Sequence, residues 1–311
     1  MQDIHSSDNT PTAELRERIQ RLRAEREAVI LAHNYQRPEV QDIADFTGDS
    51  LELSRKAAAL SARVVVFCGV HFMAETAAIL SPDKTVLLPD PESGCPMADM
   101  ITAEELRQMR QQHPQAAVVC YVNSSAAVKA ESDVCCTSAN AEQVVASLGD
   151  REILFVPDKY LGGWVARRLG RQFILWDGFC PSHVRILPSH IQQRRQEYPN
   201  AKVLVHPECR GEVAAMADEV LSTGGMLRYV RTSDAREFII GTEIGILHRL
   251  RQENPEKRFV HATELALCPN MKKITLEKVA RSLEYMEVRI AVPEAIRQRA
   301  ETAVRRMLEV S

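Results

Sequence analysis

Three cysteines, each followed directly by proline, recur along the chain at nearly even spacing. Cys95, Cys180 and Cys268 are 85 and 88 residues apart and lie in the segments GCPM, FCPS and LCPN. A single Cys-Pro pair is usually a small buried side chain at a turn. Three pairs at equivalent positions are typical of thiolate ligands that converge on one soft metal. Proline stiffens each ligand loop and removes a competing N–H.

Iron–sulfur clusters are the main metal sites that proteins hold by cysteine thiolates, and a [4Fe-4S] cluster normally has four such ligands. Three ligands would leave one iron without a protein ligand, and an open coordination position is what a catalytic metal retains. That iron could act as a Lewis acid toward a carboxylate or hydroxyl of a small substrate. The sequence has no C-x2-C pair, so no zinc-ribbon or ferredoxin motif is predicted.

Five further cysteines lie outside these Cys-Pro pairs. Cys68 and Cys120 fall in apolar runs and are predicted to be core residues. Cys135 and Cys136 are adjacent but have no counterparts elsewhere in the chain, so burial is favoured over a redox role. Cys209, next to Glu208, has no counterpart either, although it could face the central cavity. The N-terminus has no apolar signal segment, so a reducing compartment, the cytosol, is expected and a disulfide framework is not.

A second set of polar residues recurs in step with the cysteines. Each cysteine follows a hydroxyl residue by 45, 42 or 45 positions, and each hydroxyl residue follows another polar residue by 15 positions. In chain order the pairs are Tyr35 and Ser50, Asn123 and Ser138, and Glu208 and Thr223. An aspartate precedes every hydroxyl residue by five positions, at Asp45, Asp133 and Asp218. This recurrence predicts three copies of one domain around a pseudo-threefold axis.

Residues suited to proton transfer stand at the same places. His33, His206 and Glu208 lie with Tyr35 at the ends of apolar runs, and His183 follows Cys180 by three residues. Histidine titrates near neutral pH, and together with tyrosine and glutamate it can act as a general acid or base. A lone histidine at a strand end is more often a structural hydrogen-bonding residue. The repeat favours acid/base chemistry for this group.

The repeated hydroxyl residues allow two interpretations. Ser50, Ser138 and Thr223 stand near predicted helix starts, where a hydroxyl commonly caps the helix. Helix N-termini also bind phosphate and carboxylate groups, and the same geometry serves both purposes. The glycines of the Thr223–Gly225 segment TGG could let the backbone approach an anion closely. Lys272 and Lys273 could add positive charge near Cys268, although such lysines are usually only solvated.

The elements that position these residues follow an α/β pattern. Each unit has three apolar runs typical of buried parallel strands, with helical patterns between them. The predicted strands are residues 28–33, 64–69 and 85–90, then 116–122, 152–157 and 172–177, then 201–207, 237–242 and 258–265. In parallel sheets ligands bind beyond the carboxyl ends of the strands, so the polar residues are expected to share one central cavity.

The predicted fold is therefore α/β, with three homologous small three-layer domains and parallel sheets around a pseudo-threefold axis. The first domain covers residues 1–112, the second residues 113–197, and the third residues 198–311. Residues 1–12 are predicted to be a loose tail, and a helix is predicted from an N-cap at Thr12. Residues 271–286 and 294–310 are predicted to be closing helices of the third domain.

Composition excludes several classes of protein. The chain has 311 residues, a formal net charge of −3 and 5% aromatic residues. This balance gives no general attraction to nucleic acid or anionic membranes and few rings for base stacking. No apolar run approaches the roughly 18 residues of a membrane helix. Neither nucleic acid nor a membrane is expected as a partner.

Several segments together resemble one known family. They are AHNYQRPEVQDIADFTGDSLELS, GCPMADM, YVNSSAAVKAESDVCCTSANA, PDKYLG, GFCPSH, HPEC, STGGM, IGTEIGILHRL and CPNMKK. This set, which extends from about Ile30 to Lys273, is similar to the quinolinate synthases, the A proteins of bacterial NAD biosynthesis. The resemblance agrees with the repeat at all three cysteines.

The resemblance implies an enzyme that condenses iminoaspartate with dihydroxyacetone phosphate to quinolinate, with loss of phosphate and two waters. It implies a [4Fe-4S] cluster with one open iron, held by Cys95, Cys180 and Cys268. Tyr35, His206, Glu208 and His33 would be catalytic. The substrate-binding residues would be His33, Ser50, Tyr121, Asn123, Ser138, His183, His206, Glu208 and Thr223. A cytoplasmic location and a transient contact with the iminoaspartate-producing enzyme would follow.

Three alternatives share parts of this pattern. A different [4Fe-4S]-dependent hydro-lyase acting on a small dicarboxylate would use the same open iron without phosphate dependence. An iron–sulfur sensor would need a DNA-binding motif or an exposed basic surface, and the sequence shows neither. A binding protein with zinc on the threefold axis would differ in its metal, which metal analysis and electron paramagnetic resonance would distinguish.

Overall fold

A computed structural model of the chain describes residues 10–310. Most of the predicted N-terminal tail lies outside the described residues. Helix α1 spans Thr10–Glu25, so Thr12 lies inside the first turn and the prediction that it is the N-cap was wrong. The helix begins two residues earlier because the helical pattern continues through Pro11, and proline is well tolerated in a first turn.

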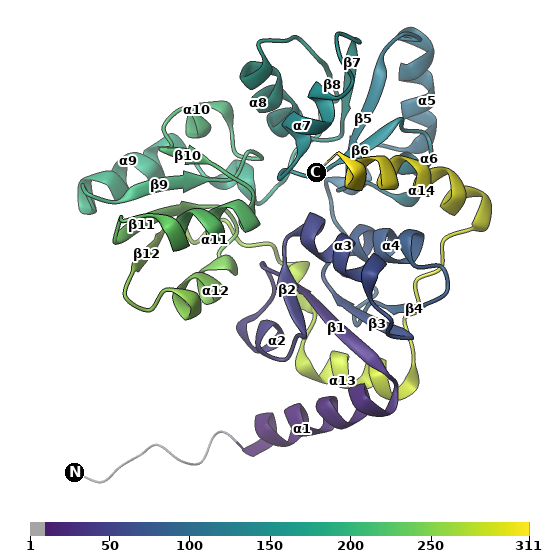
Figure 1. Cartoon of the computed structure of the whole chain (residues 1–311). Coiled ribbons are helices and arrows are strands. Elements are labelled where there is room, and N and C mark those ends of the chain that lie inside the picture. Colours follow the sequence, from purple (N-terminus) through teal and green to yellow (C-terminus); the bar gives the residue numbers. More distant parts are fainter. Residues whose placement is uncertain (1–9, 311) are drawn as a thin grey trace.

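Three parallel sheets of four strands form the framework, and Figure 1 shows them arranged around a common centre. The first contains β1 (Ala28–His33), β2 (Phe46–Gly48), β3 (Val64–Cys68) and β4 (Thr85–Leu87). The second contains β5 (Ala117–Tyr121), β6 (Val134–Cys136), β7 (Ile153–Val156) and β8 (Ile174–Leu175). The third contains β9 (Lys202–Val205), β10 (Glu219–Val220), β11 (Glu237–Gly241) and β12 (Arg258–His261). Every sheet has one order, β2-β1-β3-β4 in the first, which confirms three homologous α/β domains.

The helices connect the strands and cover the sheets. Between the strands of the first sheet these are α2 (Pro38–Asp42), α3 (Ser50–Ala59) and α4 (His71–Leu80). Helix α5 (Ala103–Gln112) precedes the second sheet, whose strands are connected by α6 (Ala126–Ala130), α7 (Ala141–Ala146) and α8 (Lys159–Leu169). Helix α9 (Pro188–Glu197) precedes the third sheet, whose strands are connected by α10 (Gly211–Ala214), α11 (Thr223–Thr232) and α12 (Ile246–Glu253). Buried strands such as β3, which is buried along its whole length, explain the unbroken apolar runs in the sequence.

Each sheet has one strand more than the sequence predicted. The additional strands are the short edge strands β2, β6 and β10, with the sequences FTG, VCC and EV. They have no apolar run, because only two or three residues pair with the neighbouring strand. An aspartate stands directly before each of these strands and helps to hold the strand in place.

The repeated aspartates supply that anchor in an identical way. The carboxylates of Asp45, Asp133 and Asp218 each accept a 2.8 Å hydrogen bond from a backbone N–H 15 residues earlier, on the central strand of the sheet. Each aspartate also pairs with an arginine of the helix that precedes its sheet, at Arg23, Arg110 and Arg195. The repeated aspartates therefore have a structural role: each one bonds to the backbone 15 residues earlier and fixes the edge strand that follows it.

The two closing helices pack outside the third domain. Helix α13 (Leu276–Tyr285) lies along α1, where Arg26 donates to the carbonyls of Leu283 and Glu284. Helix α14 (Glu294–Glu309) lies against α6, β6 and α4, as Figure 1 shows. The sequence grouped both helices with residues 198–311, whereas in the structure they pack on α1 and on α4, α6 and β6. The domain limits themselves stay a prediction.

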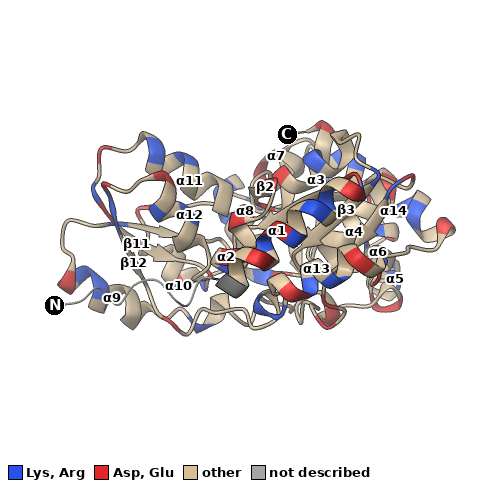
Figure 2. Cartoon of the chain, turned by 90° about the horizontal axis from the view of Figure 1, so that it is seen from below, with Lys and Arg blue, Asp and Glu red and all other residues tan. Residues whose placement is uncertain are grey.

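Charged residues of both signs are interspersed on the face that Figure 2 presents, over α1, α13 and α14 among others. None of the helices described in residues 10–310 is long and apolar enough to cross a membrane.

Candidate functional site

The carboxyl ends of the central strands meet at one cavity. The loops after β1, β5 and β9 and the three Cys-Pro loops all contribute to its wall. Every residue predicted for the site lines this cavity: His33, Tyr35, Ser50, Cys95, Tyr121, Asn123, Ser138, Cys180, His183, His206, Glu208, Thr223 and Cys268. The cavity has a volume of about 70 Å³, which is below the 300–1,000 Å³ of typical ligand pockets.

The three Cys-Pro loops have the same local structure. A short 3-10 turn begins three residues after each cysteine, at Ala98–Met100, His183–Arg185 and Met271–Lys273. The loops also bind one another, since Ser93 Oγ donates to the Asn270 carbonyl at 2.9 Å and Ser182 Oγ donates to the Leu267 carbonyl at 3.3 Å. Each loop is therefore held by its neighbour.

The three thiols influence one another electrostatically. Burial raises the pKa of Cys95 to about 12, and the charge of Cys268 adds to this effect. Burial also raises the pKa of Cys180, with contributions from Glu208, Cys95 and Cys268. Three thiolates could coexist here only with a cation between them, because metal binding removes the thiol protons and compensates the charge.

This donor set fits an iron–sulfur cluster. Three thiols from three loops open onto one cavity, and soft thiolates select iron–sulfur clusters over harder ions. A mixed set shares one member with it, because ligand atoms of Cys180, His183 and Glu208 lie within 4.8 Å of one another. Zinc accepts such a mixture of sulfur, nitrogen and oxygen, so the identity of the metal is a question for measurement.

Glu208 is the centre of the polar wall. Its Oε1 accepts hydrogen bonds from Tyr121 Oη at 2.5 Å and Asn123 Nδ2 at 3.3 Å, and its Oε2 lies 2.7 Å from His183 Nδ1. Burial opposes the charge of this carboxylate, but the neighbouring His183 and the hydrogen bond from Tyr121 more than offset burial and hold the pKa of Glu208 well below its usual range. Glu208 is therefore ionised at neutral pH.

The strand-end histidines are neutral. Burial lowers the pKa of both His33 and His206 to about 3, although Glu208 acts in the opposite direction. In each residue Nδ1 accepts a backbone N–H two residues later, from Tyr35 or Glu208. The proton is thereby assigned to Nε2, which in His206 donates to Ser138 Oγ at 3.0 Å.

Tyr35 reaches across the interface between the first and third domains. Its hydroxyl bonds to Thr242 Oγ1, and Thr242 also lies 2.8 Å from His183 Nε2. Burial and the charge of Glu208 raise the pKa of Tyr35, and the same two causes raise the pKa of Tyr121. Both phenols are therefore neutral and can donate protons.

The hydroxyl residues are not the helix caps. The N-caps are the preceding residues, Asp49 for α3 and Ser222 for α11. The predicted hydroxyls are left to act elsewhere, since Thr223 Oγ1 accepts from Asn34 Nδ2 at 3.0 Å and Ser138 accepts from His206. Of the two interpretations of these hydroxyls, capping is excluded for Ser50 and Thr223.

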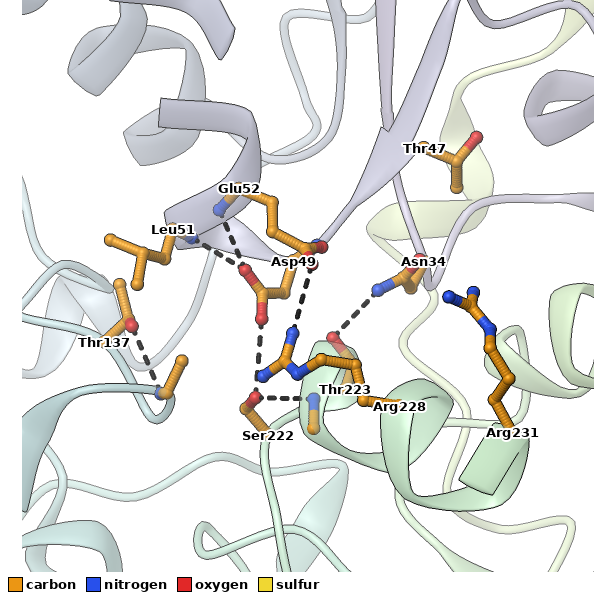
Figure 3. A network of polar contacts seen from close by, with 12 residues as sticks. Asn34, Thr47, Asp49, Leu51, Glu52, Thr137, Ser222, Thr223, Arg228 and Arg231 are labelled. Atoms are coloured by element: carbon orange, nitrogen blue, oxygen red, sulfur yellow. Dashed lines mark hydrogen bonds and ion pairs between the residues drawn. The ribbon is translucent and has the colours of Figure 1, made fainter. Parts of the chain in front are cut away.

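Figure 3 shows how the first and third domains meet beside the cavity. Asp49 lies against the start of α11, where Ser222 Oγ is 3.4 Å from Asp49 Oδ2. A Cβ on Gly224 would stand 2.5 Å from the same oxygen, so glycine is required there for close approach. The sequence predicted that the TGG segment approaches an anion; the anion nearest to Gly224 is the carboxylate of Asp49. Burial, with the charge of Glu52, raises the pKa of Asp49.

Sequence reasoning missed several residues of the wall and its support. Glu243 is fully buried, lines the cavity and accepts the Cys268 N–H at 3.1 Å. Lys272 lies 3.0 Å from Glu243 and bonds to the Tyr35 carbonyl, so the expectation that it is only solvated was wrong. The segment that contains Thr242 and Glu243 is part of the family resemblance, but the other units have no equivalent polar pair. Cys209 is buried against the Gly241 carbonyl and does not line the cavity.

Comparisons with known proteins give one consistent result. A sequence model of the family described as Quinolinate synthetase A protein matches residues 17–309. A quinolinate synthase of Dehalococcoides mccartyi strain CBDB1 is 60% identical over 293 residues, which are 94% of this chain and 97% of that protein. A quinolinate synthase of Methanoregula boonei is 58% identical over 297 residues, with 96% and 98% covered. Quinolinate synthase 1 of Methanosarcina acetivorans is 55% identical over 298 residues, with 96% and 98% covered.

Proposed function

Because the chain belongs to the quinolinate synthetase A family, whose members act in NAD biosynthesis, we propose that it condenses iminoaspartate with dihydroxyacetone phosphate to form quinolinate. The products would be quinolinate, phosphate and two waters. The observation that supports this assignment best is the joining of three cysteines and a buried acid/base group in one cavity. A transient contact with the enzyme that supplies iminoaspartate remains part of the proposal.

Cys95, Cys180 and Cys268 would hold a [4Fe-4S] cluster, whose open iron supplies Lewis acid chemistry toward a substrate carboxylate or hydroxyl. The protein supports the ligand loops through bonds that do not involve the thiols. The Glu243 carboxylate holds the Cys268 backbone N–H, and Lys272 neutralises that carboxylate.

Proton transfer would be performed by Glu208 and by tyrosines of the cavity wall, whose protonation states are determined by burial and by their neighbours. Glu208 is a carboxylate that accepts a hydrogen bond from the neutral phenol of Tyr121 and lies against His183. It can accept a proton from a substrate carbon, while Tyr35 can donate a proton to a departing hydroxyl. The isomerisation, imine formation and dehydrations of this reaction all need such exchange at neutral pH.

The phosphate of the triose would bind to hydroxyl groups at the edge of the cavity. Ser50, Ser138 and Thr223 are equivalent in the three domains and lie near the starts of α3, α7 and α11. Hydroxyl and backbone N–H groups at helix starts bind phosphate, with support from the helix dipole. The neutral Nε2–H of His33 adds a donor that does not compete as a base.

The test is an anaerobic assay with both substrates, in which quinolinate and phosphate are measured together. The proposal predicts equal amounts of the two products and none when either substrate is omitted. Phosphate-independent dehydration of a small dicarboxylate would instead identify the other cluster-dependent hydro-lyase. No quinolinate from protein that contains its full complement of iron would refute the proposal.

A further inference from the structure

A buried lysine lies behind the wall of the cavity without an acidic partner. Lys129, in α6, is fully buried, and its Nζ bonds to the Ser124 carbonyl and lies 5.5 Å from the centre of the Phe72 ring. Among the residues that the structure describes, no carboxylate forms an ion pair with it. A buried ammonium group is costly unless a charge of opposite sign compensates it.

The thiol of Cys120 shares a hydrogen-bonding partner, Ser124, with this ammonium group. Cys120 is fully buried in β5, and its Sγ lies 3.0 Å from Ser124 Oγ and 3.4 Å from the Tyr121 carbonyl. Cys135 stands opposite it in register on β6. Ser124 therefore contacts both the thiol, through its hydroxyl, and the ammonium, through its carbonyl. Burial alone would raise the pKa of Cys120, but the hydrogen bond from Cys135 and the charge of Lys129 outweigh it and lower that pKa to about 7.

Cys68 shows what burial does without a neighbouring cation. It is fully buried on β3 of the first sheet, and burial raises its pKa. Cys136, next to Cys135 on β6, also has its pKa raised by burial and by Cys120. The difference between Cys120 and these thiols is the presence of Lys129 and of a donor thiol opposite.

We propose that Cys120 is a thiolate that pairs with the Lys129 ammonium, and that this buried pair fixes residues 122–125 so that Tyr121 and Asn123 meet Glu208. The two residues flank the segment that carries Asn123, and Ser124 connects them. Asn123 Nδ2 and Tyr121 Oη both donate to Glu208 Oε1. Cys120 and Lys129 are thus positioning residues, since neither lines the cavity.

The first test exchanges the charge at position 120 while keeping its shape. Cys120→Asp and Cys120→Asn are nearly the same size and differ in charge. A paired anion predicts that Cys120→Asp melts higher than Cys120→Asn, by roughly 5 °C, in holoenzyme heated anaerobically. In a Lys129→Met background the order should reverse, because the aspartate would then be buried alone. An Asn variant as stable as or more stable than the Asp variant when Lys129 is present would overturn the pair.

A double-mutant cycle gives a second, independent result. Cys120→Ala and Lys129→Met should each lower the melting temperature, and the double variant should lose much less than the sum, because neither charge is then left unpaired. Cys68→Ala is the matched control for loss of a buried thiol, and its effect should add to that of Lys129→Met. Additive losses in the Cys120 cycle would show a neutral thiol and refute the proposal.

The positioning role rests on the proposed function and is tested by kinetics. Lys129→Met should reduce kcat/KM for quinolinate formation at least ten-fold, and Cys120→Ala/Lys129→Met should recover most of that loss. Cys68→Ala should match the unaltered enzyme. Unaltered enzyme without quinolinate synthesis would count against the proposed function alone, since the stability cycle does not depend on it. Activity of Lys129→Met equal to that of the unaltered enzyme would refute positioning.

Discussion

The three central strands β1, β5 and β9 have an outer end, near the repeated aspartates, and an inner end, at the cavity. The residues at the outer ends are the same in all three domains, whereas those at the inner ends differ. At the outer ends, Asp45, Asp133 and Asp218 make the same 2.8 Å bond to the backbone in all three domains. At the inner ends the equivalent pairs are His33 with Tyr35, Tyr121 with Asn123, and His206 with Glu208. A structural bond needs one residue type in every copy, whereas a reaction needs several different groups around one substrate. The cysteines are the exception, as expected if the three domains hold one proposed metal cluster with the same ligand from each.

Loss of one cysteine ligand should have the largest effect. Cys95→Ala is expected to abolish both the brown colour of the cluster and quinolinate formation, because two ligands do not retain a three-ligand cluster. Absorbance of anaerobically purified protein and the quinolinate assay measure the two losses. Cys68→Ala should keep both. A Cys95→Ala protein with full activity and no colour would contradict the ligand assignment.

Glu208→Gln should reduce proton transfer without affecting binding of the metal cluster. The amide keeps the shape but cannot accept a proton, so the colour should remain while kcat falls by roughly 10²–10⁴-fold. The substitution is compared with unaltered protein at equal iron content. If kcat were unchanged, Glu208 would not be the base and its low pKa would have only a structural meaning.

The neutral histidines predict how stability depends on pH. His33 and His206 have a pKa of about 3 when folded and an ordinary value near 6.5 when unfolded, so the unfolded chain binds more protons between these limits. Stability should therefore fall as the pH decreases below 6.5, by about 1.4 kcal/mol per pH unit for each histidine. Denaturant unfolding of His206→Gln between pH 6.5 and 5 should show a slope smaller by that amount. An unchanged slope would show that His206 is protonated in the folded protein.

The aspartates at the outer ends should affect stability alone, and activity least of all the changes considered. Asp133→Ala removes the acceptor for the Val118 N–H and the partner of Arg110, which should cost about 1–3 kcal/mol of unfolding free energy. Colour and activity per folded molecule should be unchanged. Denaturant unfolding measures the loss of stability, and the quinolinate assay of the same preparation measures the activity. A loss of activity without loss of stability would mean that the outer and inner ends are coupled.

The repeat in the sequence predicted the parts of the molecule that are local or copied three times. Apolar runs identified nine strands, and the spacing of Cys95, Cys180 and Cys268 placed all three thiols at one cavity. The edge strands β2, β6 and β10 escaped prediction because two or three residues have no detectable period. The N-caps were displaced by one residue, from Ser50 to Asp49 and from Thr223 to Ser222, because both residue types cap helices well.

Contacts between domains were the least predictable part. Thr242, Glu243 and Lys272 support Tyr35 and Cys268 from other segments of the chain, and they have no copies in the other units. The position of α13 along α1 is likewise a contact between the two ends of the chain. Such contacts depend on the arrangement of finished domains, which local patterns do not encode.

The most direct test of the central claim is the metal content of the protein purified and reduced without oxygen. Three equivalent cysteines holding one cluster predict about four irons and four sulfides per chain, with an electron paramagnetic resonance signal after reduction. Stoichiometric zinc in a colourless protein that makes quinolinate at full rate would contradict the account.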